Sequence, residues 1–214
     1  MNVFQIINKA PFQHMNIFSK LFGSSNATSK EENNKENKAS LPENNLSIDE
    51  QFIFNFKKNG GKFLYCENSE EVKEQFENIL QENDWYESQV LCYEPTLFTL
   101  LDENKLVYNK VTNPKFLFST CENLIAEEGS ILFSSKQIKQ HKPYELPTNI
   151  IIMAKTSQIL GFKTDGLSAI KRKYEGDYPT NITAIKYFEK AKEEDFTQYG
   201  SSAKNLYLLL LEDL

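Results

Sequence analysis

Short apolar runs alternate with amphipathic segments from residue 47 to the end of the sequence. The apolar runs predict strands, and two of them, residues 149–154 (NIIIMA) and 206–211 (LYLLLL), have the uninterrupted hydrophobicity typical of strands covered on both faces. Shorter runs predict further strands at residues 62–66, 89–92, 115–119, 124–126 and 130–133. The chain is therefore expected to build a sheet with a buried centre.

The amphipathic segments predict helices with recognisable ends. Ser47 or Asp49 can cap a first helix that runs through residue 58 and stops at Asn59-Gly60-Gly61. Asn68, followed three residues later by Glu71, has capping-box spacing before a second helix, and Pro95 opens a third that includes residues 97–101.

A fourth helix is predicted at residues 164–174, with Leu167, Ile170 and Tyr174 facing inward. Helices alternating with apolar strands indicate an α/β domain with a largely parallel central sheet and flanking helices.

The N-terminal part of the chain has a different character. Residues 23–45 are almost purely polar, so they cannot bury enough surface to offset the entropy of ordering and predict a flexible linker. Before them, residues 15–23 form a short amphipathic segment, with Ile17, Phe18, Leu21 and Phe22 at helical spacing. We expect a disordered tail over residues 1–46 and a folded domain over 47–214, and Met1 and Met15 are both open as the true start.

Composition narrows the function classes. The 214 residues carry 24 Lys and Arg against 30 Asp and Glu, and a net charge of −6 argues against a general nucleic-acid binder. The longest notable apolar run, residues 206–211, is far shorter than the ~20 residues of a membrane span, which predicts a soluble protein. Three scattered cysteines without a C-x-x-C pair predict neither a metal nor an iron–sulphur cofactor, and the lack of a secretory signal favours the cytoplasm.

Standard catalytic and nucleotide-binding motifs are absent from the sequence. A Cys121–His141 dyad is conceivable, but a lone cysteine beside a strand is more often a small core residue, and His141 fits a solvated loop. Lys136, Lys139 and Lys142 could form an anion patch or simply a solvated face.

One turn places two carboxylates between apolar strands. Glu127-Glu128-Gly129 separates residues 124–126 from 130–133, and strand alternation puts Ala126 and Glu128 on one face and Glu127 on the other. Gly129 permits a positive φ or close approach of a ligand. We expect Glu127 at a crevice beside the carboxyl ends of the parallel strands, where such sheets place their sites. The alternative is an ordinary charged hairpin tip.

Four segments, in order, carry a family resemblance. The stretch around residues 123–133 resembles the A-E-T-G-T-hydrophobic signature of the lactate-utilisation (LUD) domain family, in its C-type single-domain form. ELPTNIIIM (145–153) is similar to the family's L-P-x-x-H-I-x-V strand, with Asn149 in the histidine position. YPTNITAI (178–185) resembles its S-G-P-S-[KR]-T-A-D-I motif, and YGSSAKNLYLLLLED (199–213) resembles its ending. The resemblance spans residues 47–214.

The resemblance implies a fold and a site. The fold is the Rossmann-like α/β sandwich shared by sugar-phosphate isomerases, glucosamine-phosphate deaminases and CoA transferases. The catalytic carboxylate would be Glu127, and the expected ligand-binding residues are Glu128, Gly129, Ser130, Pro179, Thr180 and Asn181. Asn181, Ala184 and Tyr199 replace a basic residue, an aspartate and a histidine of the family pattern, so the family's pocket is expected to be altered or silent here.

Two functions follow from the resemblance. The first is an accessory, mainly interacting subunit that docks to iron–sulphur oxidoreductase subunits, which oxidise L-lactate to pyruvate. The second is a small-molecule-binding protein or a CoA-transferase- or isomerase-like enzyme that uses Glu127 as nucleophile or base. The sequence leaves open whether the chain is an enzyme or a structural relic, and whether it forms homo-oligomers.

Overall fold

A computed structural model describes residues 46–188 and 203–213. The predicted linker, the amphipathic segment at 15–23 and Tyr199 lie outside the described residues. All statements below concern the folded unit that begins at Leu46.

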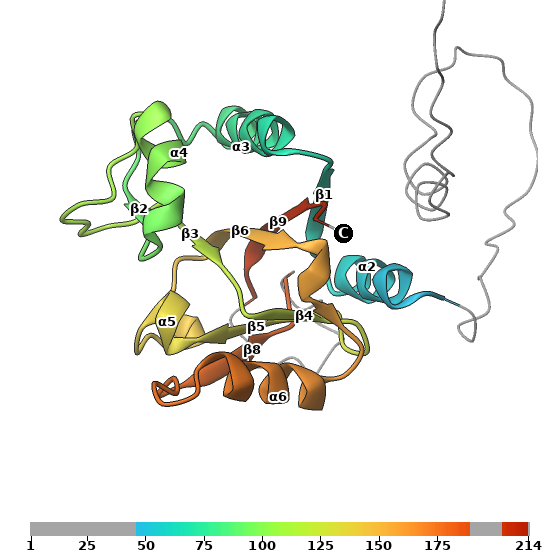
Figure 1. The fold of residues 1–214 in the computed structure, drawn as a ribbon. Helices are drawn as coiled ribbons and strands as arrows, with labels where there is room; N and C mark the ends of the chain where they lie inside the picture. Colours follow the sequence, from blue (N-terminus) through green and yellow to red (C-terminus); the bar gives the residue numbers. More distant parts are fainter. Residues whose placement is uncertain (1–45, 189–202, 214) are drawn as a thin grey trace, which may run out of the picture. The chain divides into compact units, whose positions relative to one another are not determined.

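The centre of the domain is a five-stranded parallel sheet (Figure 1). Its strand order is β1-β9-β6-β3-β2, and every neighbouring pair is parallel. The strands are β1 (Lys62–Cys66), β2 (Val90–Leu91), β3 (Phe116–Thr120), β6 (Asn149–Lys155) and β9 (Asn205–Leu211). The two uninterrupted apolar runs form β6 and β9 side by side, and their central residues are buried, which confirms that both strands are covered on both faces. Only β2 is much shorter than predicted.

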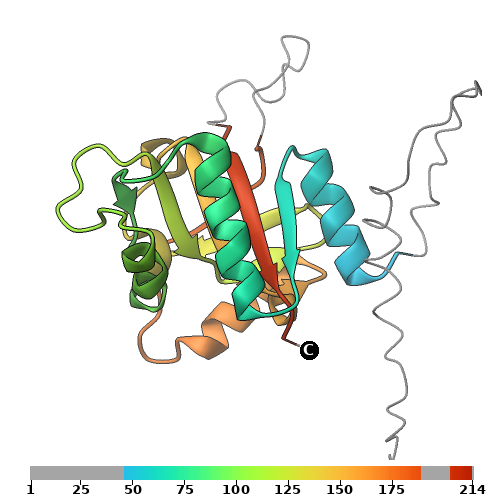
Figure 2. The same cartoon turned by 90° about the horizontal axis from the view of Figure 1, so that it is seen from above.

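Helices cover one face of this sheet. Helix α3 (Ser69–Asn83) packs on this face with its axis nearly along that of β9, and α4 (Phe98–Glu103) follows the short 3₁₀ helix η2 (Pro95–Leu97) beside it (Figure 2). Phe76 of α3 stacks on Phe118 of β3 at 4.6 Å between ring centroids, and Trp85 stacks on Phe116 at 5.0 Å. These large apolar contacts join the helices to alternate residues of the strands.

A second, four-stranded sheet lies against the other face (Figure 1). Its order is β7-β4-β5-β8, with β5 antiparallel to both β4 and β8. The strands are β4 (Asn123–Ile125), β5 (Ser130–Ser134), β7 (Ile159–Leu160) and β8 (Ile182–Ile185). Helix α6 (Lys163–Lys173) covers its outer side, so the layers run helix, sheet, sheet, helix. The α/β fold with a parallel central sheet is confirmed, and the second sheet is an addition to the prediction.

The predicted helix starts are confirmed in atomic detail. Ser47 caps α2 (Ile48–Lys58) with a full capping box, in which Glu50 accepts the Ser47 N–H at 2.8 Å. The Asn68 side chain accepts the backbone N–H of Glu71 at 3.0 Å at the start of α3. Short elements complete the chain: α5 (Ser135–Ile138), η3 (Pro143–Glu145) and η4 (Thr156–Gln158).

The predicted inward face of α6 is wrong at one position. Leu167 is exposed, and the buried residues of the helix are Gly166 and Ile170. A Cβ on Gly166 would lie 2.6 Å from Leu132 Cδ1 and 3.0 Å from Ile125 Cδ1. The helix therefore rests its backbone directly on β4 and β5, and this close approach turns Leu167 outward.

Within the described ranges, no helix combines the length and the apolar character that crossing a bilayer requires.

Candidate functional site

The predicted Glu127-Glu128-Gly129 turn is held against helix α2. Asn55 Nδ2 donates to the carbonyl oxygen of Ala126 at 2.8 Å, and Asn59 Nδ2 donates to that of Glu128 at 2.7 Å. Gly129 has φ +60°, and a Cβ there would lie 2.4 Å from the backbone of Asn55. The glycine is thus required by close backbone packing of the turn on the helix.

Glu127 serves the start of a helix in this structure. Its side chain is exposed and accepts the backbone N–H of Lys163, the first residue of α6, at 3.1 Å. The turn joins two strands of the second sheet, so it does not follow a strand of the parallel sheet as expected. Ser130 Oγ donates to the Glu128 carboxylate at 3.1 Å. The assignment of Glu127 as a catalytic carboxylate stays a prediction.

The other predicted ligand-binding residues lie elsewhere. Thr180 Oγ1 accepts a hydrogen bond from Gln140 at 2.7 Å, and the carbonyl oxygen of Asn181 accepts the N–H of Ser135 at 2.9 Å. Pro179, next to them, is buried. Because Ile182 pairs with Ser134, this group sits at the opposite end of β5 from Ser130, about 14 Å away at ~3.4 Å per residue. The structure does not bring the two predicted groups together.

A buried carboxylate organises a different region. Glu122, at the connection from β3 to β4, has only 1% of its side chain exposed. Its Oε1 accepts hydrogen bonds from Ser134 Oγ at 2.6 Å, Gln137 Nε2 at 2.9 Å and Tyr174 OH at 2.9 Å, while Lys173 Nζ lies 2.9 Å from Oε2. Donors from β5, α5 and the end of α6 thus converge on one carboxylate.

These contacts fix the charges of the cluster. Burial alone would raise the pKa of Glu122, but the hydrogen bonds from Ser134, Lys173, Gln137 and Tyr174 outweigh it and hold that pKa below its usual value. Burial would lower the pKa of Lys173, but the hydrogen bond to Glu122 outweighs it and raises that pKa. Glu122 and Lys173 therefore form a stable ion pair.

A polar pocket of about 470 Å³ opens beside this ion pair. Three partners of Glu122 line it, and we name it the strand-end pocket because Tyr93 and Glu94 follow β2 and Thr120 ends β3. Figure 1 shows β2, α5 and the carboxyl end of α6 on the same side of the molecule. The complete lining is Tyr93, Glu94, Pro95, Thr96, Thr120, Lys136, Gln137, Lys173 and Tyr174. Carboxyl ends of parallel strands are the usual location of ligand sites in α/β sheets.

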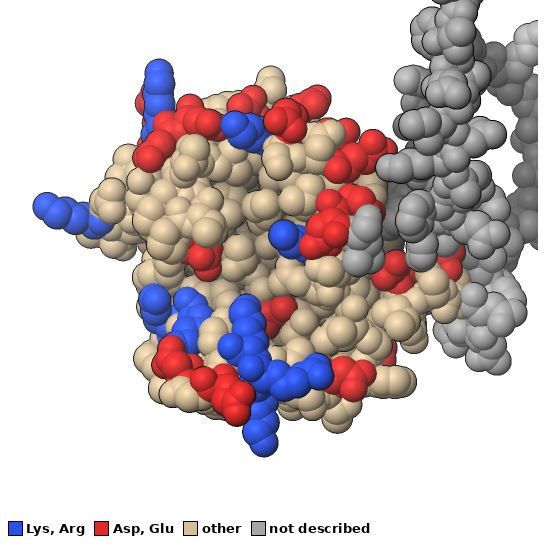
Figure 3. Space-filling view, in the orientation of Figure 1, with Lys and Arg blue, Asp and Glu red and all other residues tan. Residues whose placement is uncertain are grey.

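Two lysines give the pocket cationic groups. Lys136 forms an ion pair with Asp177, and its Nζ lies 5.5 Å from the centre of the Tyr174 ring. Lys173 Nζ lies 4.9 Å from the same ring. Figure 3 shows Lys and Arg side chains gathered over α5 and α6, whereas acidic side chains dominate over α3 and α4. The pocket can therefore offer ammonium groups to an anionic ligand.

The two residues of the conceivable Cys121–His141 dyad have different surroundings. Tyr93 OH lies 2.8 Å from His141 Nε2, and the two rings stack, so His141 is a loop residue as expected but is partly buried against Tyr93. Cys121 is buried, and burial raises the pKa of its thiol, which confirms the core interpretation. In residues 46–188 and 203–213, no three His, Cys, Asp or Glu side chains group closely enough to hold a metal ion.

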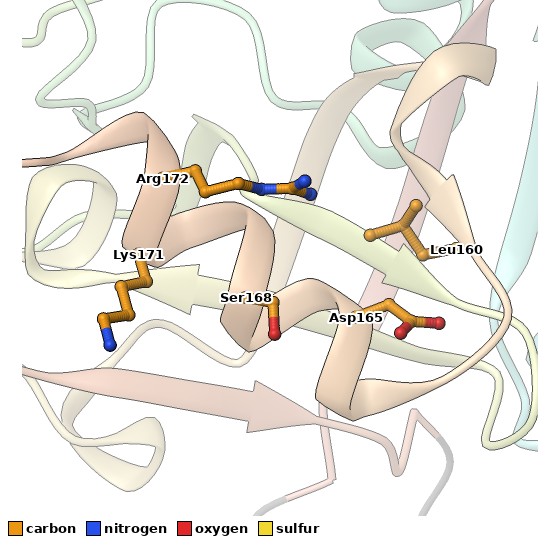
Figure 4. Close-up of a pocket in the computed structure, with 5 residues that line it drawn as sticks. All are labelled: Leu160, Asp165, Ser168, Lys171 and Arg172. Atoms are coloured by element: carbon orange, nitrogen blue, oxygen red, sulfur yellow. The ribbon is translucent and has the colours of Figure 1, made fainter.

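A second depression, of about 460 Å³, lies on α6 and is lined by Leu160, Asp165, Ser168, Lys171 and Arg172. Figure 4 shows that the Lys171 and Arg172 side chains point to different sides of the helix rather than toward one another. Its lining residues do not converge on a common centre, so the strand-end pocket is the stronger candidate.

Sequence reasoning missed most of the strand-end pocket. The sequence predicts Lys136 only as part of an anion patch and Tyr174 only as an inward-facing helix residue, and it gives Glu94, Glu122 and Lys173 no role in a site. The available signal was positional, because polar residues directly follow the apolar runs that form β2 and β3.

Comparisons with known proteins bear on the fold. No protein-family model and no curated protein matches the sequence. Among solved structures, the chain is similar to a DUF162 family protein from Deinococcus radiodurans, with a TM-score of 0.56 and 12% identity over 79% of this chain and 100% of that chain. DUF162 is a LUD-domain-like family. At this identity the likeness shows a shared α/β architecture.

Proposed function

We propose that this chain is an accessory protein of L-lactate utilisation that binds a small carboxylate in the strand-end pocket. The observation that carries the binding part is the Lys173 ammonium group, held by buried Glu122 at the carboxyl ends of the parallel strands. The lactate part is supported by the LUD-like sequence motifs and by the likeness to a DUF162 structure. The proposed partners are iron–sulphur oxidoreductase subunits, and the proposed compartment is the cytoplasm.

The pocket favours binding over covalent chemistry. Lys173 and Lys136 provide ammonium groups that can pair with a carboxylate. Since the pair with Glu122 raises the pKa of Lys173, its amine stays protonated and is a poor nucleophile toward a carbonyl group. We therefore expect reversible binding and no imine with pyruvate.

Titration calorimetry with L-lactate tests the proposal. We expect Lys173→Met to weaken binding about tenfold or more, because a charge-assisted contact is worth ~1.5–3 kcal/mol. Lys136→Met should weaken it less, since the Lys136 ammonium group already pairs with the exposed carboxylate of Asp177. Lys171→Met, two residues before Lys173 on the same helix but outside the strand-end pocket, is the matched control and should bind as the unmodified chain does.

Circular dichroism establishes whether each variant is folded. If Lys173→Met does not fold, Lys136→Met still tests whether the pocket binds the anion. Failure of the unmodified chain to bind millimolar L-lactate would overturn the binding proposal. Equal loss in Lys171→Met and Lys173→Met would show that general surface charge, rather than the strand-end pocket, holds the anion.

A further inference from the structure

We propose that Glu94 reads the substituent on carbon 2 of the bound acid, so that the strand-end pocket takes small carboxylates bearing a hydroxyl or amine there and rejects 2-keto acids. This inference rests on the proposed function, because it assumes that the carboxylate group binds near Lys136 and Lys173. It assigns Glu94 a specificity role and defines the ligand class by its hydrogen-bonding chemistry.

The Glu94 carboxylate is positioned on the pocket wall by hydroxyl groups. Thr120 Oγ1, from the end of the neighbouring strand β3, donates to Oε2 at 3.3 Å. Thr96 Oγ1 donates to Oε1 at 3.4 Å. All three side chains line the strand-end pocket. Both hydrogen bonds are long, so the two oxygens keep capacity to accept a shorter bond from a ligand.

The charges of the pocket are unevenly matched. Each lysine has a carboxylate partner, Glu122 for Lys173 and Asp177 for Lys136. Within the part of the chain that the structure describes, no ion pair to Glu94 is formed by a Lys, Arg or His nitrogen within 4 Å. Of the charged side chains that line the pocket, Lys136 and Lys173 therefore each have a carboxylate partner, whereas Glu94 has no cationic one.

This imbalance selects the ligand. A simple carboxylate leaves Glu94 without a donor, whereas a ligand that also carries a donor can hydrogen-bond to Glu94. A hydroxyl donates a hydrogen bond to a carboxylate, and an ammonium group donates one while also neutralising the charge. A keto oxygen is only an acceptor. Facing Glu94, it would leave both the keto oxygen and the carboxylate without a donor, and the two oxygens would repel one another.

Four acids with the same three-carbon skeleton isolate this effect: L-alanine, L-lactate, pyruvate and propionate. Titration calorimetry on the full chain should show L-alanine and L-lactate binding about tenfold or more tightly than pyruvate, as expected when a charged acceptor loses its donor. Propionate, which has neither donor nor acceptor on carbon 2, should fall between L-lactate and pyruvate.

Glu94→Gln tests the residue itself. Its amide offers a donor as well as an acceptor, so the preference for L-lactate over pyruvate should fall to about threefold or less, mainly through tighter pyruvate binding. Glu77→Gln, an exposed carboxylate on α3, is the matched control and should keep the original preference. Glu94→Asp retains the charge and should keep the order of the four acids.

The outcomes separate this inference from the proposed function. Equal binding of L-lactate and pyruvate by the unmodified chain, with Lys173→Met weakening both, would overturn the role of Glu94 and leave the carboxylate pocket standing. Absence of binding by all four acids would overturn both. The ratio of L-lactate to pyruvate affinity is measured on the unmodified chain. It therefore tests the inference even if Glu94→Gln does not fold.

Discussion

Glu127 and Glu122 lie at opposite ends of the short strand β4, in opposite surroundings. Glu127 is exposed, and its carboxylate accepts a backbone N–H at the start of α6. Glu122 is buried and collects donors from Ser134, Gln137, Lys173 and Tyr174. One carboxylate lies in a turn and accepts a bond from the start of a helix, while the other links β5, α5 and the end of α6 beside a pocket.

The difference shows where a carboxylate gains chemical significance in this fold. Burial without partners would disfavour the charged form of Glu122. Four side chains donate to this carboxylate and keep it ionised despite its burial. The turn at Glu127 is held chiefly by backbone contacts, through Asn55, Asn59 and Gly129. The side chain of Glu127 is therefore replaceable without loss of the turn, and that of Glu122 is not replaceable without loss of the pocket.

The largest expected effect comes from removing the buried carboxylate. Glu122→Ala leaves Gln137, Lys173 and Tyr174 without the carboxylate that accepts from them and should cost about 3 kcal/mol or more of unfolding free energy. At ~2–4 °C per kcal/mol, the Tm should fall by about 10 °C. Glu127→Ala removes one helix-end contact and should lower the Tm by no more than about 3 °C. Differential scanning calorimetry measures both, and equal losses would contradict the contrast.

A smaller effect should follow from a methyl group in the turn. Gly129→Ala would place a side chain at positive φ and within 2.4 Å of the α2 backbone, so we expect a loss of about 2–3 kcal/mol. Gly176→Ala is the matched control, because Gly176 also has positive φ (+88°) but has open space around its Cβ position. Its loss should be about 1 kcal/mol. Urea unfolding of both variants measures the difference, which reports the contact between turn and helix alone.

The smallest expected effect is a change in acid sensitivity. The partners of Glu122 hold its pKa below the unfolded value, so the stability it contributes is present above the unfolded pKa of ~4.3 and is lost as the pH falls through the folded pKa. Unfolding free energies measured by urea between pH 5 and pH 3 should therefore fall more steeply for the unmodified chain than for Glu122→Gln. Parallel profiles would mean that Glu122 is not held as an ion in the folded state.

Local signals predicted the elements of the fold well, whereas the site depends on contacts that no local signal contains. The apolar runs of β6 and β9 and the caps at Ser47 and Asn68 each involve neighbours in sequence, so their patterns were readable. The inward face of α6 was misread because a glycine at position 166 lets the helix approach the sheet, and no hydrophobic pattern marks a buried glycine.

The pocket was harder still, since Glu122 meets Lys173 and Tyr174 across separations of 51 and 52 residues. The carboxylate pair at Glu127 and Glu128 drew attention because its two members are adjacent in the sequence, and its clamp by Asn55 and Asn59 comes from about 70 residues away. Adjacent charges are visible in a sequence. A charge whose partners assemble only in the folded chain is not.

The position of β9 between β1 and β6 has a consequence for how the protein is made. Lys62 pairs with Tyr207, 145 residues later, so β1 must wait for β9 before it gains its place in the sheet. At ~5–20 residues per second, a ribosome needs roughly 7–30 s to bridge that gap. During this interval the emerging β1 and α3 expose apolar surface that β9 will later cover. The nascent chain should therefore depend on chaperones more than the finished domain does. If synthesis stops before residue 205, the chain lacks β9, the strand that joins β1 to the sheet.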